Sequence, residues 1–536
     1  MNGFSLISFL VVVIGVGLYA FRRSRRVDTD NAEGYFMGGR SLFGFTIAST
    51  IIMTNLSTEQ IVGQNGQSFQ AGMEVMAWEV TAAIAIVILA WVFLPRYYQY
   101  GIDTVSDFIA LRYDKFTQKL VSFLFIFTYV FSFLPVVLYS GALVFDKIFR
   151  VSETIHISQL TAIIIISTSI GVVGMIYLFV GGLSLSAFSD SIYGVGLLIG
   201  GLAIPIIGLY LLGEGNLLKG LDHIVTHTPE KLNAIGAIDS DIVPWPTLFF
   251  GMMFNNLFFW CTNQMVVQKA LAGRNLKEAQ KGALYVGVFK VFGALFLVFP
   301  GILAFNLFGQ QINNPDNAYP SLVNMVLPDW SYGLFGAVIF GAILSSFVGS
   351  LNSTTTLFTL DFYKEMFHKE ASERQVARVG HIMTLFVGVI VVVIAPLISL
   401  FPQGLYAVVQ EFNGIYNMPL LVLILVGFFS RKTSSFGAKV MFVSHVVLYV
   451  LSKCFLSEVH YLYVLSVLFF IDLMILWLFN RTRPTNTFDL KSVNAKVDLT
   501  PWKYRYLLGI GVIGLVVVMY ILFSPIGFAH QKPPLT

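Results

Sequence analysis

Seven consecutive residues, Thr54 to Gln60, are unusually polar for the part of the chain in which they lie. Six of the seven are polar and Glu59 is acidic, although the surrounding pattern is that of a membrane-spanning helix. Hydrocarbon leaves polar groups unsatisfied, so such a run exists at membrane depth only where it faces protein or a water-filled cavity. The run therefore predicts an interrupted helix at a binding site.

A second polar interruption lies in a later apolar segment, at Asn255 and Asn256, and is followed by Trp260 and Asn263. A single Asn in a membrane helix is usually explained by a hydrogen bond to a neighbouring helix. Two clusters at corresponding positions in the two halves instead favour a central site. Transporters with inverted repeats often break the first helix of each repeat near the midplane.

A third group of residues could bind a cation. Ala342, Ser345 and Ser346 lie at positions i, i+3 and i+4, so they share one face of a predicted helix. Two hydroxyls, together with carbonyls freed by unwinding near Met53 and Leu56, form a neutral oxygen set that suits Na⁺. A Ser pair in a membrane helix also commonly serves packing or bonds to the preceding turn, and this alternative remains open from the residues alone.

The composition indicates what must position these residues. The chain has 536 residues, of which 56% are hydrophobic and 12% are charged, as expected for a multi-pass membrane protein. Its two cysteines, Cys261 and Cys454, provide neither a disulfide framework nor metal-ligand spacing. Four arginines between Arg22 and Arg26 follow the first apolar stretch, which favours a retained helix over a cleaved signal peptide.

The hydrophobic pattern predicts an all-α chain with about fourteen membrane spans. The spans lie near residues 4–22, 43–70, 73–97, 117–146, 157–179, 185–212, 244–268, 280–307, 331–363, 378–400, 405–429, 434–453, 459–480 and 504–524.

The basic residues test this topology independently. Most Lys and Arg fall on alternate loops, including one that begins at Lys269. The positive-inside rule then places both termini outside the plasma membrane, which we expect to be a bacterial inner membrane. The bilayer is the expected partner, and no nucleic acid is expected. The sequence gives no indication of an oligomeric state.

We expect a single transporter domain over residues 1–536. An extra helix at 4–22 would precede a first inverted repeat at 43–212 and a second at 244–429. Further helices at 434–524 would complete the chain.

Several longer motifs occur in a fixed order, and on these the chain resembles the solute:sodium symporter family, in particular its sodium/glucose (galactose) cotransporter branch. The motifs are Tyr35–Leu42, Asn55–Gln60, Gly181–Ser184 with Asp190, Ala279–Gly282, and Leu351–Ser353 leading to Asp361–Lys364. The resemblance implies a leucine-transporter-type core of two inverted five-helix repeats, with one extra N-terminal and three extra C-terminal helices.

The resemblance also implies an ion site. In the family, Na⁺ is bound at positions that match the carbonyls of Met53, Leu56 and Ala342 and the hydroxyls of Ser345 and Ser346. A second Na⁺ site in some members uses an aspartate, matched by Asp190, and hydroxyls at positions where this chain has Val348 and Gly349. We therefore expect one Na⁺ per cycle, with Asp190 near the inner ion exit.

The sugar-transporting branch implies a substrate site of polar side chains with an aromatic face. The matching polar positions are Asn55, Gln60, Glu79, Asn256, Lys290 and Gln410. The inner-gate aromatic is Phe259, beside Trp260, and the outer lid carries Gln64 and Tyr406. Glu79 and Lys290 could alternatively form only a structural ion pair.

We therefore expect Na⁺-coupled import of a hexose-type sugar by alternating access. Rival solutes within the family are inositol, nucleosides, amino acids and organic anions. The chain shows no Ser/His/Asp constellation, metal cluster or phosphate loop of an enzyme, and no repeated filter sequence of a channel. A sensor would be expected to carry a signalling domain, and none is recognisable.

Overall fold

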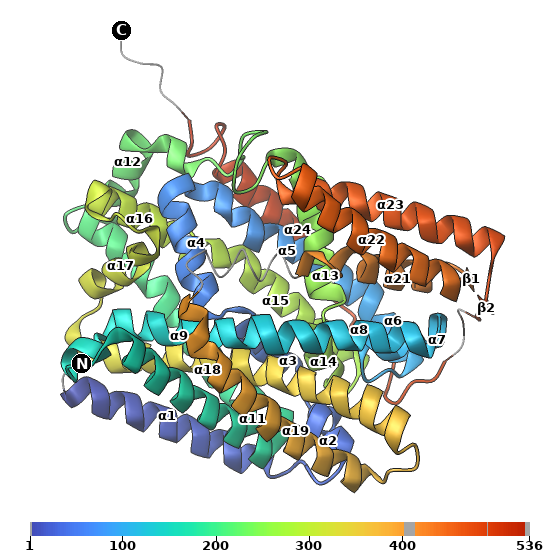
Figure 1. Cartoon of the computed structure of the whole chain (residues 1–536). Coiled ribbons are helices and arrows are strands. Elements are labelled where there is room, and N and C mark those ends of the chain that lie inside the picture. Colours follow the sequence, from blue (N-terminus) through green and yellow to red (C-terminus); the bar gives the residue numbers. More distant parts are fainter. Residues whose placement is uncertain (1–2, 401–412, 490, 492, 531–536) are drawn as a thin grey trace.

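The computed structural model describes residues 3–400, 413–489, 491 and 493–530, and it is helical almost throughout (Figure 1). Over these residues the strands are β1 (Lys432–Thr433) and β2 (Asn486–Thr487), a short antiparallel pair with Lys432 opposite Thr487. The predicted all-α class is confirmed.

The helices of the first half precede the long connection that starts near residue 228. Their bounds are α1 (Gly3–Ser24), α2 (Ala32–Met37), α3 (Gly44–Asn55), α4 (Thr58–Ala71), α5 (Ala77–Ile88), α6 (Leu94–Tyr100), α7 (Val105–Arg112), α8 (Lys115–Thr128), α9 (Leu134–Phe149), α10 (Val151–Thr154), α11 (Gln159–Leu212) and α12 (Leu217–His227).

The helices of the second half follow in the same way. Their bounds are α13 (Gly251–Cys261), α14 (Gln264–Leu271), α15 (Leu276–Leu297), α16 (Phe299–Phe308), α17 (Ala318–Val326), α18 (Tyr332–Leu357), α19 (Glu373–Ile394), α21 (Asn417–Phe429), α22 (Ser435–Phe455), α23 (Tyr461–Thr482) and α24 (Arg505–Leu522).

Ten helical stretches of the described residues are long and apolar enough to cross a membrane. The longest, α11, has 54 residues, whereas one crossing needs about 20. Gly182 interrupts it with φ 52° and ψ −149°, a conformation outside the helical region. Two of the predicted spans, 157–179 and 185–212, lie on either side of this glycine. The count of fourteen spans remains a prediction.

The first predicted helix interruption is confirmed, and the second lies at Thr262 and Asn263, beyond Asn255 and Asn256, which are inside α13. Helix α3 ends at Asn55, Leu56 has φ −85° and ψ 70°, and α4 begins at Thr58 after an extended Ser57. Helix α13 likewise ends at Cys261, and α14 begins at Gln264. With 12 and 11 residues, α3 and α13 are each too short to cross a bilayer alone.

The two interrupted pairs lie together inside the bundle. Helix α18 packs against α3, α11 and α14, and α15 packs against α3 and α5 (Figure 1). The backbone groups freed at the breaks are therefore covered by protein, which membrane depth requires.

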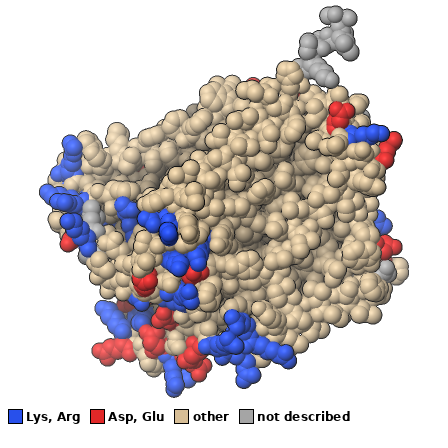
Figure 2. Space-filling view, turned by 180° about the vertical axis from the view of Figure 1, so that it is seen from behind, with Lys and Arg blue, Asp and Glu red and all other residues tan. Residues whose placement is uncertain are grey.

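The outer surface is suited to lipid. On α1, residues Phe4, Ile7, Val11, Ile14 and Leu18 recur at helical spacing and are each more than half exposed. Figure 2 shows a broad belt without charges between two charged ends, and the Lys and Arg side chains on this face gather mainly at one end. The chain is a multi-pass membrane protein.

Candidate functional site

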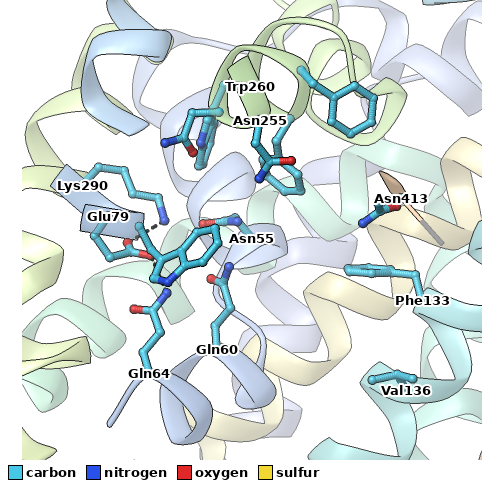
Figure 3. Close-up of a pocket in the computed structure, with 14 residues that line it drawn as sticks. Asn55, Gln60, Gln64, Glu79, Phe133, Val136, Asn255, Trp260, Lys290 and Asn413 are labelled. Carbon is cyan, nitrogen blue, oxygen red and sulfur yellow. Dashed lines mark hydrogen bonds and ion pairs between the residues drawn. The ribbon is translucent and has the colours of Figure 1, made fainter. Parts of the chain in front are cut away.

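A pocket lies beside the α3–α4 break and brings together residues from both halves of the chain (Figure 3). Eight side chains assigned from the sequence to substrate or gate line it: Asn55, Gln60, Gln64, Glu79, Asn256, Phe259, Trp260 and Lys290. The pocket also takes in Trp78, Phe133, Val136, Asn255, Phe258 and Asn413.

Two predicted residues, Tyr406 and Gln410, lie outside the described residues. Asn413 is a pocket residue that the sequence reasoning missed. An Asn-Gly pair at 413–414 inside an apolar segment was a signal that could have identified it, because it resembles the other two polar interruptions.

The only ion pair among the described residues of the pocket joins Glu79 on α5 to Lys290 on α15. Their Oε2 and Nζ atoms are 2.6 Å apart, and each side chain is 2% exposed. The amide of Gln64 donates to the other carboxylate oxygen at 2.9 Å, and the Lys290 ammonium lies 5.0 Å from the centre of the Trp260 ring. The pair is therefore electrically neutral and well bonded, as a buried ion pair must be.

Several amide oxygens of the pocket are left without a donor. The Oδ1 atom of Asn55 and the Oε1 atoms of Gln60 and Gln64 are buried and have no hydrogen-bond partner in the described part of the chain. Buried polar atoms are rarely left unpaired in native proteins. The three residues line one pocket, and acceptors without donors suit a ligand rich in hydroxyl groups.

The aromatic part of the site comes from α13. Phe259 and Trp260 both line the pocket, with ring centres 5.2 Å apart and planes at 73°. Asn256, from the same helix, uses its amide to donate to Thr81 at 2.8 Å. The pocket thus combines hydrogen-bonding groups with apolar ring surface.

The residues predicted to bind Na⁺ meet at the interface of α3 and α18. The Ser346 hydroxyl donates to the carbonyls of Thr54 at 2.9 Å and Met53 at 3.3 Å. The Ser345 hydroxyl lies 3.1 Å from the Thr54 hydroxyl. These are neutral, hard oxygen atoms in a buried interface, so the donor set fits Na⁺. Leu56 and Ala342 are also fully buried.

Lys269 was assigned to an inner loop, and the structure shows this to be wrong. It lies on α14 and is 1% exposed. Its ammonium donates to the Thr50 carbonyl at 3.0 Å and to the Thr54 hydroxyl, and it lies 4.0 Å from Asp190. Because Asp190 is remote in sequence, only the fold explains how this lysine is tolerated inside the protein.

Asp190 itself is bonded by the Thr50 hydroxyl at 2.6 Å and by Ser186 at 3.4 Å. Through Lys269 and Thr54 it is connected to Ser345, one of the predicted ion ligands. The aspartate therefore lies next to the ion site and is joined to it in two ways, through the internal cation Lys269 and by a side-chain hydrogen bond with Ser345.

The comparisons with known proteins agree with these observations. A model of the sodium:solute symporter family matches residues 35–443. The chain is 41% identical over 522 residues to the "Uncharacterized symporter YidK" of Escherichia coli K12. The alignment covers 97% of this chain and 91% of that protein. It is 28% identical to the sodium/glucose cotransporter of Vibrio parahaemolyticus, and this alignment covers 80% of this chain and 81% of that protein.

More distant similarities point the same way. The human sodium/myo-inositol cotransporter 2 is 26% identical, with 85% of this chain and 73% of that protein covered. A solved Na⁺-coupled sialic acid symporter has a TM-score of 0.77 at 18% identity, covering 91% of this chain and 100% of that one. This chain shares its fold, with the two interrupted helices at the centre.

The family match, the long alignments and the shared fold are mutually consistent. The chain belongs to the sodium:solute symporter family: it is a Na⁺-coupled membrane transporter and not an enzyme.

Proposed function

We propose that this transporter couples the entry of one Na⁺ to the uptake of one neutral polyhydroxylated solute of hexose type. The observation that carries the proposal is the set of buried amide oxygens of Asn55, Gln60 and Gln64, which lack donors among the described residues. Hydroxyl groups of a sugar would supply those donors. The relatives named for glucose and for myo-inositol both transport neutral polyols.

An anionic solute, such as the one named for the sialic acid symporter, is the main alternative. A carboxylate would need a basic group free to bind it. Lys290 is the basic side chain among the described pocket residues, and it already pairs with Glu79 at 2.6 Å. This favours a neutral solute over an organic anion, an amino acid or another charged substrate.

The oxygen set of Met53, Leu56, Ala342, Ser345 and Ser346 is our candidate for the Na⁺ site. A second ion is disfavoured by Lys269. A Cβ added at Gly349 would meet the Lys269 Nζ at 2.9 Å, so the ammonium fills the place of a side-chain ligand there. Asp190 then neutralises Lys269 and lies beside the inward ion path.

The coupling follows from adjacency. Na⁺ would hold the end of α3 against α18 and so order the break at Leu56 and Ser57. Asn55 and Gln60, one on each side of the break, would then be fixed for the solute. Tyr406 and Gln410 are proposed to close over it. The membrane potential adds about 2.3 kcal/mol per charge per 100 mV to inward movement.

The ion site is tested by Ser346→Ala in proteoliposomes. Removing a hydroxyl ligand should raise the Na⁺ concentration for half-maximal uptake about tenfold or more. Ser353→Ala is the matched control, because Ser353 lies on the same helix, is buried and bonds only the preceding turn in the structure described. Uptake that does not depend on Na⁺, or that is unchanged by Ser346→Ala, would contradict the assignment of the Na⁺ site.

The solute class is tested by a binding panel on the purified protein, with Na⁺ or with choline. D-glucose, D-galactose and myo-inositol should bind in Na⁺, and the best of them should bind more tightly than glucuronate by about tenfold or more. Glucuronate differs from glucose by a carboxylate, so it isolates charge. Tighter binding of glucuronate, alanine or uridine than of every neutral polyol would contradict the proposal.

We also propose that both termini lie outside, as the charge distribution favours. Cys454 lies at the end of α22 and is exposed, whereas Cys261 is buried. In the fourteen-span topology, the loop between spans 434–453 and 459–480 is on the same side as the termini. A membrane-impermeant maleimide should therefore label Cys454 on intact cells, and Cys454→Ser should abolish the labelling. Labelling of Cys454 only after the membrane is permeabilised would reverse the assigned orientation.

A further inference from the structure

A buried acid–base pair lies in helices that the transport cycle described above does not use. His445 is on α22 and Asp472 is on α23, and both side chains are 0% exposed. The imidazole Nδ1 lies 2.8 Å from Asp472 Oδ2, and its Nε2 lies 3.0 Å from the backbone carbonyl of Gly414. We call these three groups the 414 latch.

The geometry of the 414 latch requires a bound proton. A carbonyl only accepts hydrogen bonds, so His445 Nε2 must carry the proton directed at Gly414. The short contact to Asp472 then needs a second proton, on Nδ1 or on the carboxyl group, because two lone pairs would otherwise face each other at 2.8 Å. The pair is therefore neutral overall and holds one proton more than a neutral imidazole beside a carboxylate.

Loss of that proton breaks the latch in one of two ways. If His445 keeps its proton on Nε2, the contact with the Asp472 carboxylate becomes repulsive. If the proton moves to Nδ1, the Gly414 carbonyl loses its donor. Either outcome also leaves a negative charge on Asp472, whose Oδ1 already has no hydrogen-bond partner in the described residues.

The latch holds the backbone next to the solute pocket. Asn413, which lines the pocket, directly precedes Gly414. Position 414 has no space for a side chain, since a Cβ there would lie 2.2 Å from the Tyr449 hydroxyl. The Tyr416 hydroxyl donates to the Asn413 amide oxygen at 3.1 Å, so Asn413 is bonded within its own segment, while His445 on α22 bonds Gly414.

The same segment contacts α13, the helix that precedes the second break. Asn417, at the first position of α21, donates to the Asn255 side chain on α13 at 3.2 Å. Asn255 also lines the pocket. A shift of the backbone at Gly414 would therefore move two pocket residues that belong to different elements, Asn413 directly and Asn255 through its partner.

Few other titratable groups face the latch. The ring of Tyr449 lies parallel to His445 at 6.2 Å, and the Lys453 ammonium lies 5.7 Å from the Tyr449 ring centre. Helices α8, α13 and α21 also pack against α22 or α23. No charged side chain from their described residues is recorded in an ion pair or hydrogen bond with His445 or Asp472.

We propose that the 414 latch is a proton-dependent positioning device for the solute site. With its proton, the pair fixes Gly414 and so holds Asn413 in the pocket. Without it, the segment loosens and solute binding weakens. The link to solute binding rests on the proposed function, but the movement of position 413 does not.

Asp472→Asn keeps the hydrogen bonds of the 414 latch and removes their dependence on the extra proton. The Asn amide can donate to His445 Nδ1 while Nε2–H still donates to Gly414, so both bonds form with a neutral imidazole and need no extra proton. His445→Phe removes both bonds and keeps an aromatic ring at this position. Asp472→Asn should therefore behave like the protonated 414 latch at every pH. His445→Phe should behave like the 414 latch that has lost its proton.

The movement is measured with Asn413→Cys in full-length protein whose Cys261 and Cys454 are replaced by Ser. A maleimide labels this position in the background of the native latch, of Asp472→Asn and of His445→Phe between about pH 5 and 9. Dividing each rate by that of Asp472→Asn at the same pH removes the titration of the thiol itself.

The native latch should label as slowly as Asp472→Asn at acid pH and about fivefold faster at alkaline pH, the effect of losing one hydrogen bond. His445→Phe should be faster at all pH values. A native-to-Asp472→Asn ratio that does not change with pH would overturn the proposal. So would Asp472→Asn labelling as fast as His445→Phe.

A second readout is Na⁺-dependent binding of D-glucose and myo-inositol to the same protein without Asn413→Cys. Affinity should fall at alkaline pH in the native latch and not in Asp472→Asn. If neither polyol binds while the labelling result holds, the proposed substrate class fails and the latch stands. If binding falls equally in both proteins, the latch does not position the solute site.

Discussion

The unwound turn at Leu56 and Ser57 is the constraint on which the rest of the structure depends. A break in a membrane helix frees carbonyls and amides that lipid does not satisfy. Here they are covered by α18 on one side, where Ser346 donates to the carbonyls of Met53 and Thr54, and by the polar pocket on the other. The packing of α3, α11, α14 and α18 surrounds these unbonded backbone groups with protein.

Two charged pairs make this interior possible. Glu79 and Lys290 neutralise each other at the pocket, and Asp190 lies 4.0 Å from Lys269 beside the ion site. Each lysine alone would be a costly buried charge. As pairs they supply hydrogen bonds without net charge. The proposal of a neutral solute and a single coupling ion rests on these neutralised pairs.

Features that depend on residues close together in the chain could be predicted from the sequence. The polar run at 54–60 marked the first break and the serine pair at 345–346 marked the facing helix, because composition separates them from apolar neighbours. The Asn pair at 255–256 marked the helix that precedes the second break, which lies at Thr262 and Asn263. The pairing of Glu79 with Lys290 was an alternative that the residues themselves suggested, but two other features that depend on distant partners were not predictable. Lys269 resembled a loop lysine until the fold brought Asp190 to it, and nothing near His445 in sequence indicates Asp472 or the Gly414 carbonyl.

The central claim is that one unwound turn serves both ligands, so each must strengthen the binding of the other. Calorimetry on the purified protein would measure the Kd of the preferred polyol with and without Na⁺, and the Kd of Na⁺ with and without that polyol. The account predicts that both values fall by the same factor, since coupling between two sites is reciprocal. A polyol affinity that is equal in Na⁺ and in choline would contradict it.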